Sequence, residues 1–113
     1  MKNYIAPGDT VDVAAPYEVA SGAGALVGSL FGVATADAAN GAPVRLKTTG
    51  VFDLAKTSAQ AWTVGAKIYW DNSTKLATTT AASGANALIG VAIAAAANPS
   101  AVGRVRLSGA FTI

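Results

Sequence analysis

The side chains that most often carry out catalysis are absent from this sequence or scattered along it. Its 113 residues include no histidine and no cysteine, which removes the imidazole base, the thiol nucleophile and the zinc-thiolate site. The carboxylates are Asp9, Asp12, Glu18, Asp37, Asp53 and Asp71. Only Asp9 and Asp12 are close in sequence, and their separation puts them on opposite faces of a strand. We therefore predict that the protein is not an enzyme and that it binds neither a metal nor a cofactor.

One segment, residues 50–57, is similar to a phosphate-binding loop. It fits the Walker pattern except that Ala55 stands where the pattern has its second glycine. Its central residues alternate as a strand does, and Asp53 places a carboxylate where a bound anion would sit. A strand is the favoured interpretation, and we predict no nucleotide site.

The charge of the chain is small and spread out. Eight basic and six acidic residues give a net charge of +2, without the basic cluster that a phosphate-binding surface needs. Arg104 and Arg106 come closest to a cluster, since alternate residues of a strand share one face. A solvated face or an acidic partner is favoured there over nucleic acid. The longest apolar run, residues 87–97, is shorter than the roughly 20 residues of a membrane helix. We expect neither nucleic-acid binding nor a membrane span.

Aromatic side chains hold most of the large apolar area, and the simplest interpretation places them in the core. Aromatic residues also anchor protein interfaces, and Trp62 is the best candidate because it stands beside Gly65 in a predicted loop. Tyr4 and Ile5 are candidates for the same role, because an extended N-terminal arm can add a strand to a partner sheet. We predict that Tyr4, Ile5 and Trp62 contact a partner protein.

The elements that must position these residues are short strands. Runs of β-forming residues alternate with clusters of Gly, Pro, Asn, Asp and Ser, which predicts an all-β fold: a small β-sandwich or barrel-like domain of short antiparallel strands. We expect a single domain over residues 1–113, with residues 1–13 as a candidate extended N-terminal arm. The predicted strands are residues 4–5, 10–13, 17–19, 25–27, 30–34, 44–48, 50–54, 67–70, 75–79, 88–94, 104–107 and 110–113.

Two turns are predicted from local chemistry. Pro7-Gly8-Asp9 combines a fixed φ with a permissive one, and Asp71–Thr74 offers side chains that cap their own backbone. The second turn would join residues 67–70 and 75–79 in an antiparallel hairpin. Residues 92–97 are rich in alanine, so a helical turn is the alternative to a strand there.

Several short phrases of the sequence recur at offsets of about sixty residues. Residues 30–34 resemble 88–92, residues 44–46 resemble 105–107, and residues 50–52 resemble 109–111. This spacing indicates two related β units that share one core with pseudo-twofold symmetry. Residues 21–28 also resemble 83–90 at a different offset, and chance matches are common in sequence rich in alanine and glycine. Duplication and chance both remain open as interpretations.

Some motifs occur in a characteristic order along the chain. They are residues 1–4 (MKNY), 7–11 (PGDTV), 26–34 (LVGSLFGVA), 49–54 (TGVFDL), 62–65 (WTVG), 68–71 (IYWD) and 88–92 (LIGVA). In this order and over essentially the full chain, they resemble the small cement or decoration proteins of tailed-phage capsids. Similar proteins have often been labelled RecA-type recombinases, and the lack of an intact phosphate loop argues against that label.

The resemblance implies a β-rich structural virion protein, often a homotrimer, that binds the major capsid protein on the outer surface of an assembled capsid and stabilises it. It implies synthesis in the cytoplasm of the bacterial host and a final place on the capsid exterior. No catalytic residue carries over. The alternatives are another structural phage head or tail adaptor protein and, less favoured, a DNA-binding recombination accessory, whose DNA binding would be salt-sensitive.

Overall fold

A computed structural model describes residues 8–108, and the all-β prediction is confirmed. The strands are β1 Thr10–Ala14, β2 Gly24–Val27, β3 Leu30–Ala34, β4 Pro43–Lys47, β5 Thr49–Ala55, β6 Lys67–Asp71, β7 Leu76–Thr78, β8 Ala87–Ala92 and β9 Val102–Ser108. One short 3₁₀ helix, η1 (Ala82–Gly84), precedes β8. No helix in this part of the chain is long and apolar enough to cross a membrane.

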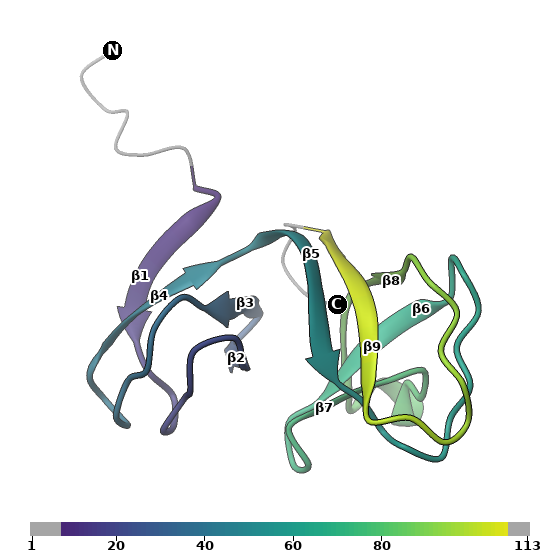
Figure 1. The fold of residues 1–113 in the computed structure, drawn as a ribbon. Helices are drawn as coiled ribbons and strands as arrows, with labels where there is room; N and C mark the ends of the chain where they lie inside the picture. The colour runs from purple at the N-terminus through teal and green to yellow at the C-terminus, as the bar shows by residue number, and fades with distance from the viewer. Residues whose placement is uncertain (1–7, 109–113) are drawn as a thin grey trace.

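The strands form two antiparallel sheets that pack together (Figure 1). One has the order β1-β4-β3-β2, and we call the part of the chain built on it the first half. The other has the order β5-β9-β8-β6-β7 and forms the second half. Residues 10–13 of the predicted arm belong to β1, which pairs with β4 at the edge of the first sheet.

Strands form here because buried and exposed residues alternate. In β9, Gly103, Val105 and Leu107 are buried and the residues between them are exposed. β3 differs from this pattern, because Phe31 and the three residues after it are all buried. A strand covered on both faces needs apolar or small residues throughout, and β3 therefore lies between two cores.

Two predicted elements differ from the observed ones. Residues 17–19 form no strand, because Val19 makes only an isolated antiparallel bridge with Ala38 that no neighbouring residue continues. The predicted strand 88–94 ends at Ala92, and residues 92–97 contain no helical turn. Strands predicted at residues 4–5 and 110–113 lie outside the described part of the chain.

The predicted hairpin is confirmed. β6 and β7 are antiparallel, with Asp71 opposite Leu76. The Asp71 carboxylate accepts hydrogen bonds from the Ser73 backbone N–H (3.0 Å), the Ser73 hydroxyl (2.7 Å) and the Thr74 backbone N–H (3.3 Å). The turn is therefore capped by its own side chain, as its composition indicates.

The second half is an almost closed barrel. After β5 the chain turns so that Lys56 forms a parallel bridge with Ala77 of β7, and the Thr57 N–H donates to the Ala77 carbonyl (3.0 Å). The two edge strands of the sheet thus meet, which leaves few unpaired edge groups. The first half has no strand equivalent to β7 and stays an open sheet.

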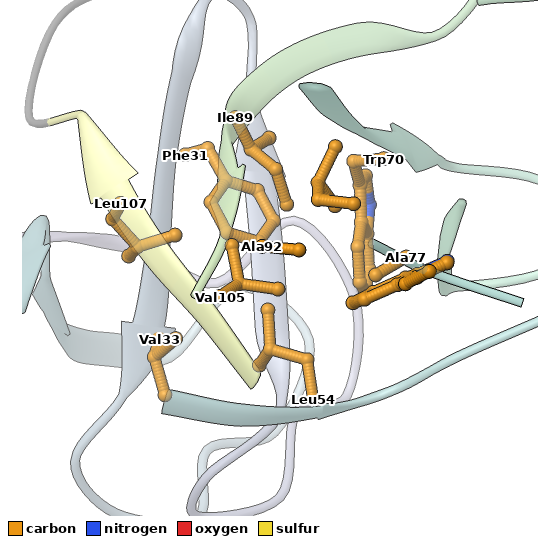
Figure 2. Close-up of a cluster of buried hydrophobic side chains, with 11 residues drawn as sticks. Phe31, Val33, Leu54, Trp70, Ala77, Ile89, Ala92, Val105 and Leu107 are labelled. Carbon is orange, nitrogen blue, oxygen red and sulfur yellow. The ribbon is translucent and has the colours of Figure 1, made fainter. Parts of the chain in front are cut away.

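Two clusters of buried side chains form the core. The larger fills the barrel and includes Phe31 and Val33, which β3 contributes from the first half (Figure 2). The ring centroids of Phe31 and Trp70 are 5.1 Å apart. The smaller cluster lies in the first half and consists of Ala15, Val19, Ala25, Ala34, Ala38, Val44 and Leu46. Because β3 supplies side chains to both clusters, the halves are packed as one unit.

The two halves repeat one topology, which supports duplication over chance. The order β1-β4-β3-β2 corresponds to β5-β9-β8-β6, with β7 added at the end. Hydrogen bonds repeat as well: the Thr35 N–H donates to the Arg45 carbonyl at 3.0 Å, and the Ile93 N–H donates to the Arg104 carbonyl at 3.2 Å. β3 corresponds to β8, as the sequence repeat predicts.

Other parts of the predicted repeat need correction. Arg45 corresponds to Arg104 and not to Arg106, because Arg45 and Arg104 each lie opposite an aspartate of the first strand of their half. β2 corresponds to β6, so the resemblance of residues 21–28 to 83–90, which spoke against duplication, does not join equivalent elements. Short stretches of this sequence resemble one another at several offsets. Only the pairing of the strands shows which residues of the two halves are equivalent.

Candidate partner-binding surface

The segment similar to a phosphate loop is a strand, as predicted. β5 runs through it and pairs with β9 along its full length. Lys56, which follows, is only 2% exposed. Its ammonium donates to the carbonyls of Thr57 (2.8 Å) and Ser100 (3.3 Å) and lies 5.7 Å from the centroid of the Trp62 ring. This cation is directed inward and is not available to a phosphate.

The acidic side chains do not gather in a site either. Residues 8–108 contain no group of three or more side chains that could hold a metal ion. Asp12 and Asp53 instead pair with Arg45 and Arg104, and in both pairs 2.9 Å separates carboxylate Oδ1 from Nε. Hydrogen bonds from these arginines lower the pKa of both carboxyl groups. Carboxylates that stay ionised in this way suit ion pairing rather than proton transfer.

Trp62 lies in the core and not on the surface. It is 2% exposed, and its ring packs against the backbone at Gly103, where a Cβ would come within 2.2 Å of a ring atom. The neighbouring Gly65 suggests a loop, but the backbone of Trp62 pairs with Ala96 in both directions, and the ring points inward. Trp62 therefore offers no surface to a partner in this structure. Tyr4 and Ile5 lie outside the described residues.

Exposed apolar side chains lie instead on the outside of the barrel, on both sides of the salt bridge between Asp53 and Arg104. Four large hydrophobic side chains are exposed within residues 8–108, and three of them lie on or directly after neighbouring strands: Val51 (49%), Ile93 (38%) and Val102 (51%). The fourth, Val64, is in a turn before β6. We define the outer face as Val51, Asp53, Ile93, Val102, Arg104 and Arg106. A rigid sheet that presents apolar groups beside arginines is suited to binding another protein.

The sequence predicted only the basic part of the outer face. Arg104 and Arg106 were expected to share one face of a strand, and both are exposed on β9. Val51 was missed, because it is followed by Phe52 and the apolar pair does not show which residue points outward. The pattern that could have identified Val51 as exposed is its spacing of two residues from Asp53, since a charged strand residue marks the exposed face.

A pocket of about 540 Å³ lies between the two halves. It is lined by residues 17–24 of the first half and by Leu54, Ala55, Trp70 and Lys75 of the second. The Tyr17 hydroxyl donates to the Gly24 carbonyl (2.8 Å), and the Lys75 ammonium lies 4.2 Å from the centroid of the Tyr17 ring. Burial raises the pKa of Tyr17. The cation and the ring stabilise the contact between the halves.

The fold and the outer face together define a class: a small all-β structural protein whose exposed sheet is suited to contact with other proteins. The family model of phage cement proteins matches residues 5–107. The chain belongs to the phage cement protein family, as its motifs predicted, and is a structural protein associated with the capsid of the virion. No curated protein and no solved structure gave a significant match.

Proposed function

We propose that the protein binds the outer surface of an assembled phage capsid and stabilises it. The observation that carries this proposal, beside the family, is the outer face, whose exposed Val51, Ile93 and Val102 stand on a rigid sheet. A protein that binds the assembled shell but not its separated subunits stabilises the shell by the free energy of that binding. The proposed role requires neither a cofactor nor turnover.

The proposed partner is the major capsid protein, and the proposed active form is a homotrimer made in the cytoplasm of the bacterial host. Several copies of the outer face held in one oligomer would gain avidity, so that modest contacts produce slow release. Tyr4 and Ile5 are proposed as further contact residues, in an N-terminal arm that adds a strand to a partner sheet.

The direct test adds purified protein to capsids that lack it. We expect saturable co-sedimentation with the particles and an increase in the temperature at which the particles lose their contents. Free capsid subunits serve as the control and should bind much more weakly. Failure to co-sediment, or binding to tails rather than heads, would contradict the proposal.

A variant of the outer face shows whether this surface makes the contact. The triple variant Val51→Thr, Ile93→Thr and Val102→Thr keeps β-branched side chains on the strands but adds hydroxyl groups to the apolar surface. We expect capsid binding to weaken by about 1–3 kcal/mol, the cost of burying hydroxyls without partners, or roughly five- to 150-fold. Val64→Thr makes the same change at an exposed position off the outer face and should bind normally. Equal loss in both variants would show that the outer face has no special role.

A further inference from the structure

The repeat between the halves extends to exposed charges. Asp12 lies opposite Arg45 on β1 and β4, and Asp53 lies opposite Arg104 on the equivalent strands β5 and β9. In both pairs the same two atoms, Nε and Oδ1, are 2.9 Å apart, and side-chain exposure ranges from 53% to 65%. The same surface salt bridge therefore occurs at the same place on each half.

A second cation accompanies each salt bridge. Lys47 follows Arg45 by two residues, and Arg106 follows Arg104 by two, so each cation shares the face of its salt bridge. Lys47 lies opposite Thr10, two residues before Asp12. Arg106 likewise lies opposite Val51, two residues before Asp53. Within residues 8–108, no carboxylate is close enough to Lys47 or Arg106 to form an ion pair. Each half thus has one neutralised arginine and one cation without an acidic partner.

The interiors of the two halves differ far more than these charged faces. The bridge between Val19 and Ala38 is equivalent to the bridge between Trp62 and Ala96, so a valine in one core stands where the other has a tryptophan. Exposed salt bridges contribute little to stability, and most exposed substitutions change it little. Lys47 is half-buried and Arg106 is exposed, but both keep their positive charge beside the salt bridge. Folding alone therefore does not explain why the charged residues match although the buried residues do not.

We propose that each half binds one carboxylate-bearing patch of the capsid surface, so that a single chain joins two such patches. This inference rests on the proposed function and names the groups through which it acts. In each site the aspartate holds the arginine in place, and the unpaired Lys47 or Arg106 gives a net positive charge that is complementary to an acidic protein surface. One or two cations per face are too few for a nucleic-acid backbone. Two weak contacts on one packed chain gain avidity, which suits a protein that braces neighbouring subunits.

The test removes the unpaired cations one at a time. Lys47→Gln and Arg106→Gln should each weaken co-sedimentation with capsids by a similar factor of about tenfold or more, since either change turns two-site binding into one-site binding. The double variant should lose saturable binding. The matched control exchanges the cations, Lys47→Arg with Arg106→Lys, which keeps both charges and should bind as the unaltered protein does. Thermal melting of every variant verifies that folding is unchanged.

The possible results separate this inference from the proposed function. Weakening by only one of the single variants would overturn the inference, because a single site would then account for binding. Unchanged binding of the double variant would overturn it as well, and in both cases capsid binding by the unaltered protein leaves the proposed function standing. If the unaltered protein binds a DNA fragment and not capsids, both are overturned.

Discussion

At single positions, the two halves fill equivalent parts of their cores with different residues. Val19 and Val44 both belong to the buried cluster of the first half, and their equivalents in the second half are Trp62 and Gly103. The missing side chain of Gly103 makes room for the indole, since a Cβ there would lie 2.2 Å from the ring. A large residue opposite a small one and two of medium size fill similar volumes, which a core at native density requires.

This compensation predicts strong coupling between the two positions. Gly103→Val forces the ring out of place and should reduce the free energy of unfolding by about 3 kcal/mol, and Trp62→Val leaves a cavity that should cost about 3–5 kcal/mol. The double variant recreates the valine pair of the first half and should lose at least about 1 kcal/mol less than the sum of the two. Denaturant unfolding measures all three. Strict additivity would contradict the proposed complementarity.

Among the elements, those built from local chemistry were predictable and those built from distant pairing were not. The turn at Asp71–Thr74 was predictable, because its acceptor and donors lie within four consecutive residues. The position of Trp62 was not, because it depends on a bridge to Ala96 that no local pattern indicates. The outer face was predictable in part. The alternation of residues in β9 was visible in the sequence, but the contribution of β5 depends on whether Val51 or Phe52 faces outward.

The β6–β7 hairpin depends on the Asp71 cap, and this dependence has a pH signature. Hydrogen bonds from Ser73 lower the pKa of Asp71. Its stabilising effect is therefore complete above the ordinary aspartate pKa of about 3.9 and is lost as the pH falls through the lower pKa of the folded protein. Asp71→Ala should lower the melting temperature by several degrees at neutral pH, and by much less in strong acid.

Asp71→Asn is the matched control for this cap. Its amide oxygen can still accept hydrogen bonds from the turn, so it should melt between the unaltered protein and Asp71→Ala and depend less on pH. A difference between the unaltered protein and Asp71→Ala that persists undiminished in acid would show that the ionised cap is not the cause.

On the scale of the whole molecule, the duplication joins two unequal units. The second half forms an almost closed barrel and the first half is an open sheet (Figure 1). The second half has the larger core, and the core of the first consists of alanines, valines and one leucine. The sequence indicated two related units but left chance open, because phrases rich in alanine and glycine match at several offsets. Repeated hydrogen bonds distinguish the true equivalences. A core as small as that of the first half gains stability by packing against a larger neighbour.

Phe31 is the main side chain through which the first half gains this support. It belongs to β3 of the first half but is 6% exposed within the core of the second, beside Trp70 (Figure 2). Phe31→Ala should therefore lower the free energy of unfolding by about 3–5 kcal/mol. In the unaltered protein, tryptophan fluorescence, whose signal comes from Trp62 and Trp70 of the second half, and far-ultraviolet circular dichroism, which reports on both halves, should change in one coincident transition. In Phe31→Ala the first half loses its anchor, so its β signal should begin to melt before the tryptophan signal. Coincident, undestabilised transitions in the variant would mean that the halves are held together mainly by other contacts, such as the cation of Lys75 on the ring of Tyr17.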